Sequence, residues 1–306
     1  MTDHRYFAKA VSLAAGAATL GLLGIAAALW SVPARAEVAV NGGESFGPLR
    51  LEVISIVDDP DPFSGTMWTR YNADSASRSV LNEAGLANGD GQPSTLLTRT
   101  GLPLVAWARN SPQGYDVVLS RFEDGAWGEP DVLAGGSLDE LDPHLFVNPV
   151  DDRVHLVYWV HDTTPRVMHR EAPADLSTWS AAVRVSQAGE PACVPHGVFH
   201  GGLMKVAYEV HDFGIGASPR QIVLATRDGQ AFFAEMLSVT YHNEGNWPQV
   251  HSANSALWVD WIDSDGEMAW IRLLPGGWGT VQVEGYQDQE ERDYHVRGKI
   301  ESLALD

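Results

Sequence analysis

The sequence predicts an all-β fold arranged as a β-propeller, and two observations carry this prediction. After residue 36, short runs rich in Val, Leu, Trp and Tyr are separated by Gly, Pro, Asp and Asn, as is typical of an all-β chain. Four of these runs begin at a proline, and the prolines are Pro93, Pro143, Pro195 and Pro248, spaced by 50, 52 and 53 residues. A repeat of about 50 residues is the size of a propeller blade.

Each repeat continues in the same order. The strand that begins at the proline is followed by a second apolar strand, namely Leu104–Trp107, Leu156–Trp159, Lys205–Tyr208 and Val259–Trp261. A third strand then ends in a base (Arg121, Arg170, Arg227 or Arg272), and a polar turn, an aromatic residue and a last strand follow. Four strands per repeat is the plan of a propeller blade. A β-sandwich is the alternative, because regularly spaced strands also suit that fold.

The two ends of the chain are expected to complete a fifth blade. Met67–Arg70 ends 51 residues before Arg121 and so falls in the register of a third strand. Tyr294–Val296 begins 46 residues after Pro248 and opens a further strand-like stretch. Pairing N-terminal with C-terminal strands would close a ring of five four-stranded blades and leave no open seam.

Residues 1–36 have the features of a signal peptide. Met1–Lys9 is slightly basic, Ala10–Trp30 is an uncharged apolar run, and Ala34–Ala36 supplies small residues at a cleavage site. We therefore expect cleavage before Glu37 and a secreted or periplasmic protein with a single domain over 37–306. The apolar run is long enough to span a bilayer, so an uncleaved membrane anchor is the alternative.

Composition excludes several classes of partner. The chain has 40 acidic and 20 basic residues, for a net charge of −20. A strongly acidic surface repels phosphate backbones and anionic lipids, so we expect no nucleic acid and no membrane contact beyond the signal segment. Cys193 is the only cysteine, which excludes an intrachain disulfide.

The order of residue types within the repeats resembles that of the sialidase-like propellers with BNR repeats, over roughly residues 93 to 285. The resemblance rests on stretches such as Arg121–Trp127 and on degraded copies of the family's Asp-box at Asp124–Trp127, Leu176–Trp179 and Asp228–Gly229. The Asp-box is a structural turn, and the family's arginine motif is not recognisable in this chain. The resemblance therefore implies an architecture rather than an activity.

One end of the propeller is expected to carry the functional residues. The start of each first strand and the end of each second strand meet at the same end of a blade, because the two strands are antiparallel. Ser94, His144, His196, Gln249 and His295 occupy first-strand starts, and Arg109, Asn110, His161, Asp162, His211, Asp212 and Asp263 occupy second-strand ends. We predict that His144, His161, Asp162, His196, His211, Asp212, Gln249 and Asp263 line a ligand-binding mouth.

Two interpretations of this mouth stand side by side. Imidazoles and carboxylates around one opening suit a carbohydrate or another small polar ligand, and they could also hold a divalent cation. The sequence indicates no other cofactor. The structural alternative is that each aspartate accepts hydrogen bonds from turn amides while each histidine packs beside a tryptophan.

Two carboxylates interrupt the repeat within apolar strands. Aligning the second strands places Glu209 where Trp107, Trp159 and Trp261 stand, and Asp260 where Tyr158 and Tyr208 stand. Desolvation raises a carboxyl pKa towards the range of a general acid, so Glu209 and Asp260 are the predicted catalytic pair of a glycoside hydrolase. A salt bridge, to Lys205 or to an arginine of a blade, is the simpler explanation. We therefore predict an exported propeller that recognises a carbohydrate or another small polar ligand at this mouth. The alternative is a glycoside hydrolase that uses the carboxylate pair on the same face, and a purely structural interaction module comes third.

Overall fold

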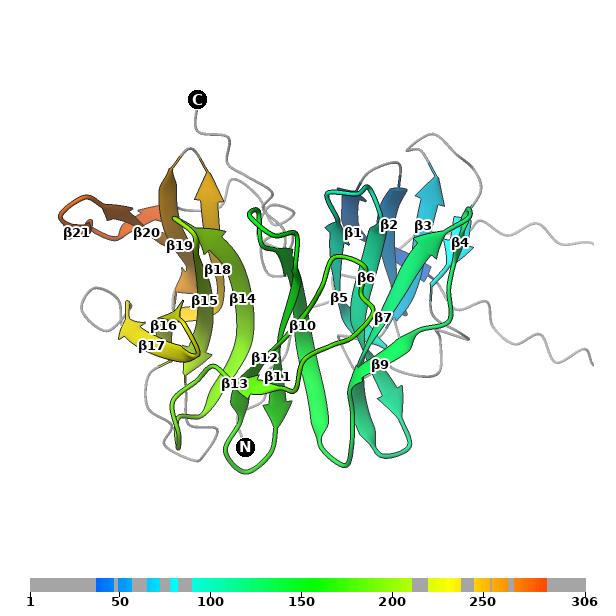
Figure 1. Cartoon of the computed structure of the whole chain (residues 1–306), viewed down its shortest axis with the longest axis horizontal. Helices are drawn as coiled ribbons and strands as arrows, with labels where there is room; N and C mark the ends of the chain where they lie inside the picture. The colour runs from blue at the N-terminus through cyan, green and yellow to red at the C-terminus, as the bar shows by residue number, and fades with distance from the viewer. Residues whose placement is uncertain are drawn as a thin grey trace, which may run out of the picture. The chain divides into compact units, whose positions relative to one another are not determined.

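The computed structural model describes residues 37–46, 49–56, 65–71, 78–81, 90–210, 220–237, 245–253, 255–263 and 267–284. All regular structure in these residues is β-strand (Figure 1). Along the described chain, no helix is long and apolar enough to cross a bilayer.

The strands form five antiparallel sheets in chain order, which we call blades 1 to 5. Blade 1 contains β1 (Glu37–Phe46), β2 (Leu49–Ile56), β3 (Gly65–Tyr71) and β4 (Arg78–Val80). Blade 2 contains β5 (Gly91–Leu97), β6 (Pro103–Ser111), β7 (Gly114–Glu123), β8 (Ala126–Trp127) and β9 (Asp131–Ala134). Blade 3 contains β10 (Asp139–Val147), β11 (Val154–His161), β12 (Arg166–Ala172) and β13 (Val183–Arg184).

Blade 4 contains β14 (Ala192–His200), β15 (Leu203–Val210), β16 (Gln221–Asp228) and β17 (Ala231–Met236). Blade 5 contains β18 (Gly245–Ala253), β19 (Ala256–Asp263), β20 (Met268–Leu274), β21 (Gly277–Trp278) and β22 (Gln282–Glu284). In blades 2 and 5 the outermost strand is split, because β8 and β9 both pair with β7 and β21 and β22 both pair with β20.

These sheets confirm the predicted all-β propeller class with four-stranded blades. The segment Met67–Arg70 lies in β3, the third strand of its blade, as expected. All four strands of blade 1 come from residues 37–80, so this sheet has its four strands without the C-terminal segment. The stretch from Tyr294 to Val296 lies outside the described residues, and closure of the ring by C-terminal strands stays a prediction.

A bulge recurs at the proline of the first strand in blades 2 to 5. In β10, β14 and β18 the pairing register shifts around this point, and the residue before the proline has a left-handed φ: 46° at Asp142, 49° at Val194 and 55° at Trp247. Proline cannot donate a ladder hydrogen bond, and a bulge accommodates it. The bulge also re-aims a side chain, and a non-glycine residue with positive φ is uncommon enough to suggest a functional position.

Hydrogen bonds between successive blades explain why the residue after each proline is polar. Ser94 Oγ accepts from the Leu145 amide at 3.0 Å, and His144 Nδ1 accepts from the Gly197 amide at 3.1 Å. His196 Nδ1 accepts from the Val250 amide at 3.3 Å. The same position in three consecutive blades therefore bonds to the backbone of the next blade, and this blade-to-blade ladder fixes the spacing of the first strands.

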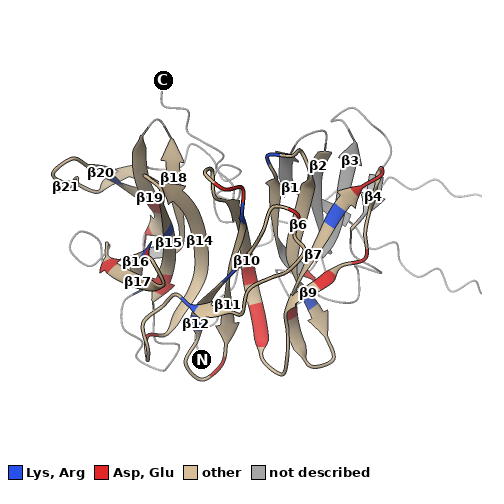
Figure 2. Cartoon of the chain, in the orientation of Figure 1, with Lys and Arg blue, Asp and Glu red and all other residues tan. Residues whose placement is uncertain are grey.

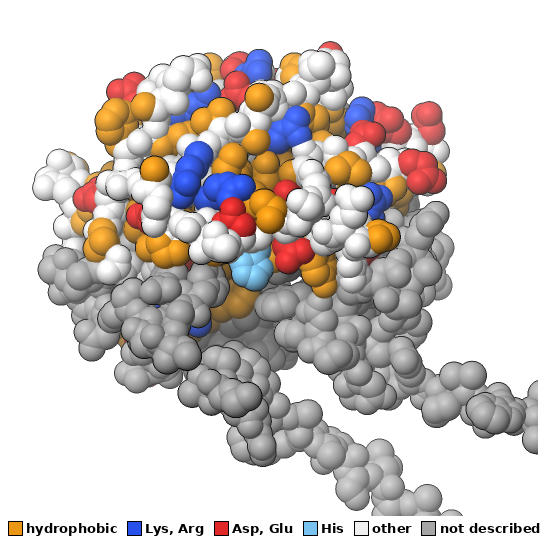
Figure 3. All heavy atoms as spheres, turned by 90° about the horizontal axis from the view of Figure 1, so that it is seen from below, with side chains coloured by type: hydrophobic (Ala, Val, Ile, Leu, Met, Phe, Trp, Pro, Cys, Tyr) orange, Lys and Arg blue, Asp and Glu red, His pale blue; other side chains and the backbone are white. Residues whose placement is uncertain are grey.

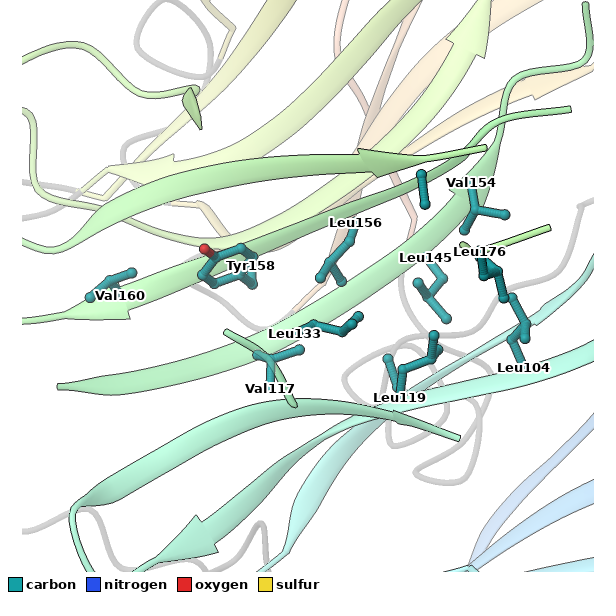
Figure 4. Close-up of a cluster of buried hydrophobic side chains, with 12 residues drawn as sticks. Leu104, Val117, Leu119, Leu133, Leu145, Val154, Leu156, Tyr158, Val160 and Leu176 are labelled. Atoms are coloured by element: carbon teal, nitrogen blue, oxygen red, sulfur yellow. The ribbon is translucent and has the colours of Figure 1, made fainter. Parts of the chain in front are cut away.

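The core lies between the blades. Figure 4 shows one cluster, in which Leu104, Val117 and Leu119 of blade 2 face Leu145, Leu156 and Tyr158 of blade 3. Trp107, Tyr208 and Trp261, which occupy the same place in the second strands of blades 2, 4 and 5, are fully buried. These aromatic residues are therefore core residues between blades, as expected from their periodicity.

The pairing register corrects the predicted alignment of Asp260. Asp260 lies opposite Gln249. The residues at the same point of blades 3 and 4 are Val157 and Ala207, not the expected Tyr158 and Tyr208. The error is one residue, which in a strand places the side chain on the other face of the sheet.

Gly197 offers a direct test of the packing between blades 3 and 4. A Cβ at this position would lie 2.3 Å from Cε1 of Phe146. We expect Gly197→Ala to lower the free energy of unfolding by about 1–3 kcal/mol, the usual cost of overpacking, and Phe146→Leu to relieve part of that loss in the double variant. Gly128→Ala is the matched control, since its Cβ would lie 3.7 Å from the nearest atom. Urea denaturation measures both, and equal stability of the two alanine variants would contradict this packing.

Candidate functional site

The first strand of blade 3 begins with a group of acids. Asp139, Glu140 and Asp142 stand within four residues at the start of β10, and Figure 2 shows acidic residues at the lower end of this strand. Seen from below in Figure 3, acidic and basic side chains lie among apolar ones and a histidine reaches the surface. Burial, followed by the charges of Asp116 and Asp139, raises the pKa of Glu140 to about 7. Glu140 is therefore a proton-holding group that the sequence analysis missed.

Asp142 occupies the bulge of β10. The indole Nε1 of Trp159 donates a hydrogen bond of 2.6 Å to its Oδ2. Burial raises the pKa of Asp142 to about 6; the Trp159 hydrogen bond opposes this rise, and the charge of Glu209 adds to it. At pH below about 6 this side chain holds a proton, as a general acid requires.

Glu209 lies on β15 of the neighbouring blade and is only 3% exposed. It pairs with Cys193 as Trp159 pairs with Leu141, so it stands where blade 3 has a tryptophan. The predicted alignment with Trp107 and Trp261 is wrong by one residue, because the register places these two tryptophans level with Tyr208. The Trp247 amide lies 3.4 Å from Oε2, and Arg220 Nε lies 3.6 Å from Oε1. Glu209 thus forms a salt bridge with Arg220. The other base considered, Lys205, instead donates to Thr226 Oγ1.

These groups belong to one cluster, which we call the mouth cluster: Asp142, Cys193, Glu209, Arg220 and Trp247. Burial raises the pKa of the Cys193 thiol well above its usual value, and the charges of Glu209 and Asp142 raise it further. The cysteine is therefore a neutral group next to the carboxylates. The cluster draws on blades 3, 4 and 5, and two of its members occupy the left-handed bulge positions.

Asp260 has different neighbours. Its Oδ2 lies 2.9 Å from Nε2 of His251, and the His251 ring stacks on Trp258 with centroids 5.5 Å apart. It is 4% exposed and lies opposite Gln249, which is also buried. The contact between Asp260 and His251 therefore lies within blade 5, whereas Glu209 contacts Arg220 and the bulge of β18.

His144 and His196 lie next to each other, with ring centroids 3.7 Å apart. Each uses Nδ1 as the acceptor in the blade-to-blade ladder. Burial, followed by the charge of His251, lowers the pKa of His144 to about 3, so this ring is neutral at pH 7. The structure thus gives both histidines a structural contact in addition to their predicted place near the mouth.

The remaining predicted residues lie at strand ends, in a turn or outside the described residues. The His161 side chain is 49% exposed, with Nδ1 3.8 Å from Oδ2 of Asp139. Asp162 accepts the Thr164 amide at 2.8 Å and pairs with Arg166, while Asp263 accepts the Glu267 amide at 2.9 Å. These aspartates shape turns, as the structural alternative expected. His211, Asp212 and His295 lie outside the described residues.

No protein-family model and no curated protein matches the sequence. Among solved structures, the chain is similar to an α-L-arabinanase of Penicillium chrysogenum complexed with arabinobiose, at 15% identity and a TM-score of 0.55, covering 80% of each chain. It is also similar to a polysaccharide lyase, the ulvan lyase PL25 bound to -[GlcA(1-4)Rha3S]-, at 10% identity and a TM-score of 0.56, covering 78% of this chain and 67% of that one. At such identities the similarity shows the fold alone, a propeller shared with carbohydrate-active enzymes.

Proposed function

We propose that the chain is a glycoside hydrolase that works at the mouth cluster, with Asp142 as the general acid and Glu209 as the ionised carboxylate. One observation carries this proposal: two carboxyl groups from adjacent blades lie in one cluster, where burial raises the pKa of one and an arginine forms a salt bridge with the other. Burial holds a proton on Asp142 up to about pH 6, while Glu209 is paired with Arg220. Environments that separate the roles of two neighbouring acids are typical of acid–base catalysis.

The chemistry follows from these two states. Asp142 donates its proton to the glycosidic oxygen as the bond to the anomeric carbon breaks, so the leaving sugar departs as an alcohol. Glu209, on the other side of the bond, either takes a proton from the water that attacks the anomeric carbon, or attacks this carbon itself. In the second case water then hydrolyses the glycosyl–Glu209 ester, with the ionised Asp142 taking the proton of that water and Glu209 leaving as a carboxylate. The solved structures that share the fold support a carbohydrate substrate, since one holds arabinobiose and the other an oligosaccharide of GlcA and Rha3S.

A substrate panel tests the proposal. Arabinan and ulvan fragments represent the polymers suggested by the two similar structures, and sialosides represent the resemblance of the repeats. Release of reducing sugar from any member by the parent protein is expected, and its loss in both Asp142→Asn and Glu209→Gln would support the assignment. Absence of turnover across the panel would contradict a hydrolase.

Carbohydrate recognition without turnover is the second candidate. Trp247 is partly exposed beside Glu209, and an indole face suits stacking on a pyranose. In this case oligosaccharides bind to the parent and Trp247→Ala weakens binding, but no product forms. Calorimetry with the same panel separates the two candidates.

We also propose export with cleavage before Glu37. Strand β1 begins at Glu37, so cleavage there leaves the first blade intact. Expressed with its full N-terminus in a bacterium, the protein is expected in the periplasm or medium with Glu37 as its first residue, as mass spectrometry would show. Recovery of the uncleaved chain in the membrane fraction would favour the anchor.

A further inference from the structure

We propose that His155, His169 and Glu171 form a transition-metal site that takes Zn²⁺, at the end of blade 3 opposite the mouth cluster. His161 pairs with Asp139 at the mouth end of β10 and β11, whereas Val154, next to His155, pairs with Val147 at the other end. The site is independent of the proposed hydrolase activity.

Strand geometry brings the three side chains together. His155 on β11 lies directly opposite Glu171 on β12. His169 is two residues before Glu171, and side chains two apart in a strand share a face. Nδ1 of His155 lies 2.9 Å from Nε2 of His169 and 3.7 Å from Oε2 of Glu171, and one ligand atom from each residue lies within 4.8 Å of the others.

The donor set matches zinc better than calcium or magnesium. Two imidazoles and one carboxylate, with a fourth position open, form a common zinc site, whereas calcium and magnesium take oxygen ligands. Tetrahedral zinc with bonds of about 2.0–2.1 Å holds its nitrogens about 3.3 Å apart. The two imidazole nitrogens need to separate by only a few tenths of an ångström.

The surroundings favour neutral, fixed imidazoles. His155 is 3% and His169 is 1% exposed. The rings of Phe146 and Phe199 pack on His155 with centroids 5.5 and 4.9 Å away, and Phe232 lies 6.1 Å from His169. An apolar shell restricts water and strengthens metal–ligand bonds, while the 22% exposure of the Glu171 side chain leaves a route of entry.

Two arginines orient the carboxylate. Arg227 Nη1 of blade 4 lies 2.8 Å from Oε2 of Glu171, and Arg153 Nη2 lies 3.4 Å from Oε1. Ligating carboxylates are commonly held by such outer partners. Their positive charges oppose a dication, so the site is expected to have moderate affinity. Because Arg227 belongs to blade 4, an occupied site would strengthen the contact between blades 3 and 4.

Zinc titration of the full chain, first stripped with a chelator, tests the site. Calorimetry is expected to give one Zn²⁺ per chain, and at a hundredfold excess over the dissociation constant the melting temperature should rise by about 5 °C or more. Co²⁺ in place of Zn²⁺ should give the visible spectrum of a four-coordinate ion. Absence of binding by the parent chain would overturn the proposal.

Variants separate this site from surface histidines. His169→Ala and Glu171→Gln should each weaken zinc binding by more than the 10- to 100-fold typical of losing an outer partner. His161→Ala is the control, since this exposed histidine lies on β11 outside the cluster and its loss should leave binding unchanged. Circular dichroism shows whether each variant folds. If His169→Ala does not fold, zinc binding by Glu171→Gln still tests the site. Unchanged binding in Glu171→Gln, or equal loss in His161→Ala, would refute the site.

Discussion

Asp142→Asn is expected to lower kcat/KM for the cleaved glycoside by about 10²- to 10⁴-fold, the usual contribution of a general acid. The amide keeps the size of the side chain but has no proton to give to the leaving oxygen. Substrate affinity should change little, so the loss appears in kcat. Initial rates on the best substrate of the panel measure this effect.

The pH profile gives a second view of the same residue. Because Asp142 must be protonated to act and its pKa is about 6, kcat/KM of the parent should fall as the pH rises through about 6. In Glu209→Gln the neighbouring negative charge is removed, so any residual activity should lose its acid at a lower pH.

Controls make the assignment exclusive. Asp263→Asn changes a buried aspartate at the end of β19, which accepts a hydrogen bond from the Glu267 amide, and should retain activity if the protein folds. Asp260→Asn tests the pair predicted from the sequence. Full activity in Asp142→Asn together with loss in Asp260→Asn would contradict the mouth cluster and restore Glu209 and Asp260 as the pair.

His144→Gln is expected to make the protein more resistant to acid. Burial lowers the pKa of His144 to about 3, well below its value of about 6.5 in an unfolded chain. The unfolded state therefore binds more protons between these two values, and stability falls as the pH drops from about 6.5 towards 3. At pH 5 the loss from this one ring is about 2 kcal/mol.

The substitution copies a residue that the fold already uses at this position. Gln249 occupies the equivalent place in blade 5, and a glutamine oxygen can still accept the Gly197 amide. At pH 7 the two proteins should have similar urea midpoints. Between pH 7 and pH 5 the free energy of unfolding of the variant should fall by up to about 2 kcal/mol less than that of the parent. Asp142 and Glu140, whose raised pKa values act in the opposite sense, are present in both proteins and cancel. Parallel loss of stability in both proteins would contradict a buried neutral His144.

The sequence was sufficient to predict the architecture because the repeat is a property of single strands. In blades 2 to 5, proline marks the bulge of the first strand, and an aromatic residue of the second strand packs between blades. The number of strands per blade follows from these marks and was confirmed. The composition of blade 1 was not predictable in this way, because β1 has no proline at the expected place and its bulge falls in a run of glycines.

The site was predictable only in part. Glu209 stood out because it replaces an aromatic residue, and the structure places it in a buried cluster. Asp142 did not stand out, because the residue before the proline differs from blade to blade. Only the positive φ at this position shows that the bulge changes the direction of its side chain. The proposed zinc ligands lie on two adjacent strands. His169 and Glu171 follow His155 by 14 and 16 residues, and only the strand register brings them next to it. Asp260 was misaligned because the alignment was built on the Val-His-Asp sequence of residues 160–162 and 210–212, which the corresponding repeat at Asp260 lacks.

The central claim is that carboxyl groups from blades 3 and 4 meet around a glycosidic bond. A crystal structure of Glu209→Gln soaked with the best oligosaccharide of the panel tests this claim most directly. We expect the glycosidic oxygen about 2.6–3.2 Å from the Asp142 carboxyl group. A sugar bound elsewhere, such as the hollow at the outer edge of blade 2 lined by Arg121, Trp127 and Asp131, would contradict it.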